Sequence, residues 1–134
     1  MPAWIDNTPG PTGALDAMLE VIRTGATNIL LVTSYTQGET YATVVGRSVA
    51  DAAINTGNFT GPASSGNNRI LTFTGASATA SGNASTPDLH MVITNGTDTL
   101  LAISDESTDQ DIVSGNTVNF GSFEIRALQP SSVP

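Results

Sequence analysis

The most constraining feature of the sequence is the segment LHMVITNGTDTLLAIS, residues 89–104. Two apolar runs flank the polar turn NGTD at 95–98, and a turn of this composition between such runs is a strong short-range signal for a β-hairpin. We therefore expect strands near 89–94 and 99–104. The hairpin also contains His90, the only histidine of the chain, so its role bears on any assignment of function.

Other segments of the chain predict one helix and several further strands. Residues 13–24, GALDAMLEVIRT, carry apolar side chains at the i, i+3, i+4, i+7 spacing of a half-buried helix, with Thr12 as its N-cap. Residues 40–45 fit either a strand or a single helical turn, and the Gly- and Asn-rich segment 55–68 is predicted to be a loop. The remaining strands are expected at 28–34, 69–75, 76–81 and 116–128, the last of them broken by a bulge near Gly121.

Short strands separated by turns are typical of a mainly β fold. We expect a β-sandwich or partly open barrel of about six to eight strands with one N-terminal α-helix. The 134 residues suit a single β-rich domain, predicted at 13–130, with a flexible N-terminal arm at 1–12 and a C-terminal tail at 131–134. The arm is rich in Pro and Gly yet carries Trp4 and Ile5, which either pack on the domain's own surface or bind a neighbouring protein chain. We predict the second role for them.

The charge of the chain is sparse and strongly negative. Twelve acidic residues face four arginines, no lysine is present, and the net charge is −8. Such a chain is repelled by phosphate backbones and by anionic lipids, so we expect neither nucleic acid nor membrane as a partner. The chain contains no cysteine, which excludes disulfides and thiolate sites.

No motif in the sequence indicates an enzyme. His90 is the only histidine that could act as a base, and Asp88 would lie beside it because residues two apart share a face of a strand. The GxSxG pattern that would supply a nucleophile does not occur, and His90 is predicted to lie with Val92 and Thr94 on the more polar face of its strand. We therefore expect no catalytic residue and no enzymatic activity.

The acidic segment 105–111 is the one candidate for a metal site in the sequence. Loops dense in carboxylates can bind calcium, but this segment lacks the glycine and glutamate spacing of an EF-hand. Phosphate-binding patterns with a glycine-rich loop and a lysine are also missing. We expect neither a structural metal nor a cofactor.

The second half of the chain resembles a group of small virion structural proteins of tailed bacteriophages. The resemblance rests on the order RILTFTGASATASGNAS, DLHMVITNGTDTLLAIS and VSGNTVNFGSFEIRAL, with a closing strand just before a proline. The helix at 13–24 followed by ILLVTS fits the same layout, so the resemblance covers most of residues 13–130.

The resemblance implies a non-enzymatic role: decoration and reinforcement of the outer surface of a phage capsid. It also implies the major capsid protein as partner, a homo-oligomer with a trimer favoured, and a location on the capsid surface of the virion. Two alternatives stay open, namely a tail, neck or fibre component of the same virion and a secreted adhesion module that binds carbohydrate or calcium.

Overall fold

A computed structural model describes residues 13–106 and 109–129 of the chain. Trp4, Ile5, the arm at 1–12 and the tail at 131–134 therefore lie outside the described residues, and their predicted roles stay predictions. Helix α1 spans Ala14–Gly25, which confirms the predicted helix; its N-cap is Gly13 rather than Thr12. No helix in the described part of the chain is both long and apolar enough to span a membrane.

The chain has the predicted mainly β fold, with nine strands in the described residues. A four-stranded antiparallel sheet has the order β2-β1-β6-β7, a three-stranded sheet the order β3-β4-β9, and β5 pairs with β8. The strand bounds are β1 Asn28–Val32, β2 Ser48–Ala53, β3 Phe59–Ser65, β4 Asn68–Phe73, β5 Ala76–Thr79, β6 His90–Thr94, β7 Leu100–Asp105, β8 Thr117–Phe120 and β9 Phe123–Ala127.

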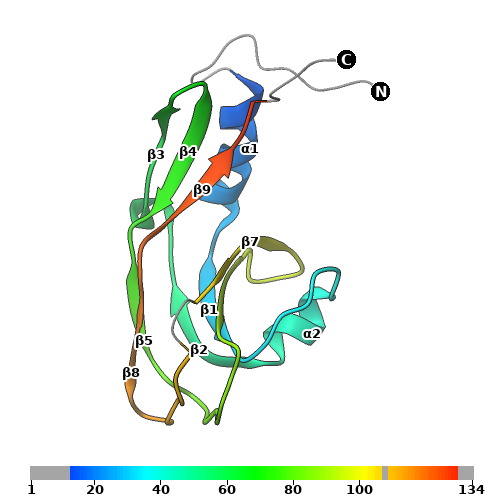
Figure 1. Ribbon diagram of the computed structural model, residues 1–134, viewed down its shortest axis with the longest axis vertical. Helices are drawn as coiled ribbons and strands as arrows, with labels where there is room; N and C mark the ends of the chain where they lie inside the picture. Colours follow the sequence, from blue (N-terminus) through cyan, green and yellow to red (C-terminus); the bar gives the residue numbers. More distant parts are fainter. Residues whose placement is uncertain (1–12, 107–108, 130–134) are drawn as a thin grey trace.

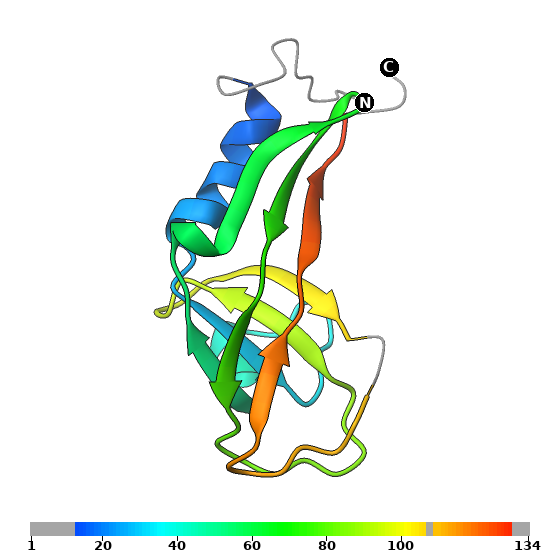
Figure 2. The ribbon, with the colours of Figure 1, turned by 90° about the vertical axis from the view of Figure 1, so that its left-hand side faces the viewer.

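The elements form an elongated, sandwich-like molecule (Figure 1). Helix α1 packs against β3, β4 and β9 at one end, while β5 and β8 continue the β4–β9 pair toward the other end (Figure 2). The four-stranded sheet lies behind the lower half of this long ribbon (Figure 2). The long ribbon is interrupted at Gly75, between β4 and β5, and at Gly121, between β8 and β9. Gly75 has a φ of +115°, which residues other than glycine rarely adopt.

One large apolar cluster holds these layers together. It includes Leu19 from α1, Phe73 from β4, Ile93 from β6 and Phe120 from β8, all essentially inaccessible to water. Burial of this many large side chains is the main source of stability for a chain without disulfides. The cluster faces one side of the four-stranded sheet, which we call the inner face.

A buried ion pair joins helix α1 to the three-stranded sheet. Arg69 on β4 donates from Nε and Nη2 to the two carboxylate oxygens of Asp16, over 2.6 and 3.0 Å. The side chains of Asp16 and Arg69 are 3% and 10% exposed. Removal of either partner would leave a buried charge uncompensated, so the pair fixes how the helix sits on the sheet.

The hairpin predicted at 89–104 is confirmed as β6 and β7. Asn95 holds the turn, since its side-chain oxygen accepts hydrogen bonds from the backbone N–H groups of Thr97, Asp98 and Thr99 over 2.9–3.0 Å. Gly96 has a φ of +77°, and a Cβ there would lie 2.5 Å from the hydroxyl of Thr27. Only glycine fits this position.

The predicted loop at 55–68 is wrong. A 3₁₀ turn at Thr56–Asn58 leads into β3, which pairs with β4 through residues that are mostly exposed. The apolar anchor is Phe59, whose ring lies 5.8 Å from that of Phe73. Gly61 and Pro62 disguised this strand in the sequence, because they occupy an irregularity of register between Thr60 and Ala63.

The structure settles the ambiguous segment 40–45 and adds a strand that the sequence did not predict. The ambiguous segment 40–45 forms a short helix, α2, at Tyr41–Val45. Strand β2 follows it, and its small residues SVADAA gave no strand signal. The strand at 116–128 is broken near Gly121 as predicted, and its halves β8 and β9 pair with different strands. These differences raise the strand count above the predicted six to eight.

Candidate functional site

The face of the four-stranded sheet opposite the main core is the best candidate for a binding surface, and we call it the outer face. Register places Leu30 and Val32 of β1 beside Val92 and His90 of β6 on this face. Together with Val44 of α2, the three aliphatic strand residues form a second, much smaller apolar cluster. The outer face is therefore buried at its centre and is not the polar surface that the sequence predicted.

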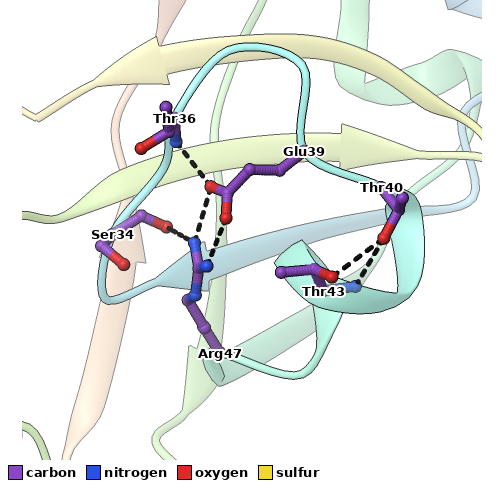
Figure 3. A network of polar contacts seen from close by, with 6 residues as sticks. All are labelled: Ser34, Thr36, Glu39, Thr40, Thr43 and Arg47. Atoms are coloured by element: carbon purple, nitrogen blue, oxygen red, sulfur yellow. Dashed lines mark hydrogen bonds and ion pairs between the residues drawn. The ribbon is translucent and has the colours of Figure 1, made fainter.

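The segment 33–47 covers part of the outer face, and a polar network holds it there (Figure 3). Arg47 donates a hydrogen bond of 2.7 Å from Nη1 to Glu39 and forms a second contact to the same carboxylate from Nη2. Arg47 also reaches the carbonyl of Ser34, and Glu39 accepts from the backbone N–H of Thr36 over 2.6 Å. These contacts close the loop on itself and place Tyr35 against the second cluster.

Hydrogen bonds within this loop stabilise the ionised form of Glu39. Hydrogen bonds from Arg47 and from the backbone of Thr36 lower the pKa of Glu39 from 4.5 to about 2. Thr40 adds a local constraint, because its hydroxyl accepts from the backbone N–H of Thr43 and caps α2 (Figure 3). The loop is thus a formed structure at neutral pH.

Strand β7 forms the uncovered margin of the outer face. It is an edge of the four-stranded sheet, and no strand among the described residues pairs with its other side. A shallow hollow of about 190 Å³ lies here, lined by Tyr35, Val92 and residues 100–103. Ile103, which projects on this face opposite Val92, is 41% exposed. An open strand edge next to an exposed apolar side chain is a typical template for pairing with another chain.

His90 lies at the end of the outer face, beside Asp88 as predicted. Its side chain is 12% exposed, and its ring packs 6.0 Å from that of Tyr35. Nδ1 lies 3.9 Å from the Asp88 carboxylate, and Nε2 lies 3.6 Å from the carboxylate of Asp105. The sequence did not predict the contact with Asp105, which depends on the register between β6 and β7.

The acidic segment 105–111 uses two of its carboxylates to hold neighbouring backbone. Asp109 accepts a hydrogen bond from the N–H of Leu89, and Asp111 accepts one from the N–H of Thr86, each over 2.8 Å. The same segment borders a hollow of about 310 Å³ beside Phe120. Its carboxylates therefore tie the segment to the chain before β6.

Comparison of the chain with protein-family models, with curated proteins and with solved structures finds no match.

Proposed function

We propose that this chain is a non-enzymatic virion structural protein that decorates and reinforces the outer surface of a tailed-phage capsid. The sequence resemblance over residues 13–130 supports the class of protein. The observation that carries the proposal is the edge of β7, which no strand in the described part of the chain pairs with, together with the exposed side chain of Ile103. We propose that this edge, with the adjoining outer face, docks on the major capsid protein.

The composition of the chain favours this mode of attachment over a charge-driven one. Without lysine and with four arginines, the chain has few positive groups to offer a partner. Three of those arginines, Arg23, Arg47 and Arg69, are engaged in ion pairs that are at least partly buried. Attraction then comes from backbone pairing along β7 and from burial of apolar side chains.

Oligomerisation and the N-terminal arm complete the proposal. We propose a homo-oligomer, with a trimer favoured, because decoration proteins of this kind bind at local symmetry axes of the shell. Trp4 and Ile5 would add an apolar anchor in a neighbouring chain.

The test is co-expression with the major capsid protein encoded in the same genome, followed by isolation of assembled particles on a gradient. We expect the chain to sediment with the particles in a copy number that matches the capsid lattice, in the hundreds. A copy number of a dozen or fewer in complete virions would instead assign it to the neck or tail. Failure to bind any particle would contradict both virion roles.

A matched pair of substitutions tests the docking edge. Ile103→Asp places a charge on the margin of the outer face, whereas Val113→Asp places one at a similarly exposed aliphatic residue outside the strands. We expect Ile103→Asp to reduce particle occupancy at least about tenfold, since a buried unpaired carboxylate is costly at an interface. Val113→Asp should bind as the wild type does. Equal occupancy for both variants would place the docking surface elsewhere.

A further inference from the structure

Three potential metal ligands meet on the outer face where β6 begins and β7 ends. Asp88 precedes β6, His90 begins it, and Asp105 ends β7 directly opposite His90. One ring nitrogen and one oxygen from each carboxylate lie within 4.8 Å of one another. Asp88 and Asp105 are 64% and 71% exposed, so the group is open to solvent on one side.

Backbone contacts fix which nitrogen of His90 is available. Nδ1 lies 3.0 Å from the carbonyl oxygen of Asp88. A carbonyl can only accept, so Nδ1 carries the hydrogen and donates it. In the neutral imidazole, Nε2 then bears a lone pair. A metal-binding histidine commonly donates its second ring N–H to a backbone carbonyl in this way, which orients the ring.

The other ring nitrogen, Nε2, faces the carboxylate of Asp105. The Asp105 carboxylate oxygen lies 3.6 Å away, which is too far for a hydrogen bond. Two ligands about 2.1 Å from one ion at a tetrahedral angle lie about 3.4 Å apart. The observed separation is therefore close to that of two ligands sharing a cation.

The site is held in place from both flanks. The N–H of Asp88 donates to the carbonyl of Thr33 over 2.9 Å, and the N–H of Glu106 donates to the carbonyl of Leu89 over 3.0 Å. The His90 ring is largely buried against Tyr35. Asp105 lies 3.6 Å from Nε2, whereas the Asp88 carboxylate lies 3.9 Å from Nδ1 and has to turn toward Nε2 to share an ion with it. Its side chain is 64% exposed and therefore free of tight packing.

We propose that Asp88, His90 and Asp105 bind a divalent transition-metal ion of the zinc class. The imidazole nitrogen favours zinc over calcium or magnesium, which take oxygen ligands. Two carboxylates balance the charge of the ion, and three protein ligands leave a further position for water or another group. The site shares Asp105 with strand β7, but the proposal does not require capsid docking and is tested on the isolated chain.

The test is titration of the untagged full chain with zinc chloride by isothermal calorimetry at neutral pH, and with cobalt chloride by visible absorption. The sequence has one histidine and no cysteine, so an absorption spectrum of nitrogen-ligated cobalt reports on His90 alone among the side chains. We expect one equivalent of zinc to bind, and zinc to raise the melting temperature by several degrees while calcium does not.

Variants distinguish zinc binding at the proposed site from non-specific attraction of cations to an acidic protein. His90→Phe keeps a ring against Tyr35 and should abolish zinc binding. Asp105→Asn changes an exposed group and should weaken binding about 10–100-fold or more. Glu124→Gln removes one negative charge from β9 and should leave the affinity unchanged. Absence of zinc binding at millimolar concentration, equal binding of calcium, or undiminished affinity in His90→Phe and Asp105→Asn would overturn the proposal.

Discussion

The two faces of the four-stranded sheet are made by the same strands and yet differ in what covers them. The inner face contributes Ile29, Leu31 and Ile93 to a core that extends through α1 and both other β layers. The outer face contributes Leu30, Val32 and Val92 to a small cluster closed mainly by the segment 33–47. The inner face therefore carries most of the stability, while the outer face remains open along β7.

Because of this difference, the open side of the sheet is the better candidate for a binding surface. The side chains of an element that is completely buried in a core contact only the rest of the fold. A partly covered face has apolar groups and backbone edges that a partner can contact. The outer face also brings together, at its end, three side chains that could bind a metal ion: Asp88, His90 and Asp105. The edge of β7 and the candidate metal site both lie on this partly covered side of the sheet.

Two neighbouring residues on β6 test whether the inner face of the sheet contributes more to stability than the outer face. Ile93 and Val92 are both fully buried, but they point to the inner and the outer face respectively. We expect Ile93→Ala to lower the free energy of unfolding by about 3–4 kcal/mol, because it leaves a cavity in a large core. We expect Val92→Ala to cost about 1–2 kcal/mol, since fewer carbons are lost beside a hollow that can relax.

Chemical denaturation of both variants measures this difference. The midpoint of unfolding is compared, and so is the slope with which the free energy of unfolding falls with denaturant concentration. Equal costs for the two variants would show that the outer cluster matters as much for stability as the inner core. A lower slope for Val92→Ala alone would show that the outer cluster unfolds separately from the rest.

Acid provides a smaller and more local perturbation of the outer face. The folded-state pKa of Glu39 is lowered from 4.5 to about 2, so its ion pair with Arg47 stabilises the fold above pH 4.5 and is lost as the pH falls toward 2. We expect Glu39→Gln to be less stable than the wild type near pH 6, with the difference disappearing below about pH 2.

Thermal melts across this pH range measure the effect, with Glu124→Gln as the control because its ion pair with Arg126 is exposed. The exposed pair should contribute little at any pH. A Glu39→Gln difference that persisted unchanged to pH 2 would mean that the lost contact does not depend on the charge of Glu39.

The local parts of the fold could be predicted from the sequence, and the long-range parts could not. The helix α1 and the β6–β7 hairpin have their own periodicity and turn residues, so they were found. Strand β3 was missed because its apolar anchor is a single residue, Phe59, and the rest of its pairing depends on β4. The buried pair between Asp16 and Arg69 joins residues 53 positions apart, a contact for which the local pattern gives no signal.

The candidate metal site shows the same limit within one hairpin. Near the turn, Thr94 pairs with Leu100. If this register continued along both strands, His90 would lie opposite Ser104. A register shift between Ile93 and Thr94 moves the pairing by one residue and places Asp105 opposite His90 instead. Hydrophobic pattern and turn type do not specify such a bulge, so the sequence assigned His90 no partner on β7.

Hydrogen exchange, measured on the chain bound to capsids and free in solution, shows most directly whether the open side of the four-stranded sheet is the side that binds. We expect slower exchange on binding at residues 100–105, because unpaired backbone groups of the β7 edge would gain partners, and a smaller effect at 33–47. The sheet of β3, β4 and β9 should be unchanged. Protection confined to that sheet or to α1, with β7 exchanging as in the free chain, would contradict the account.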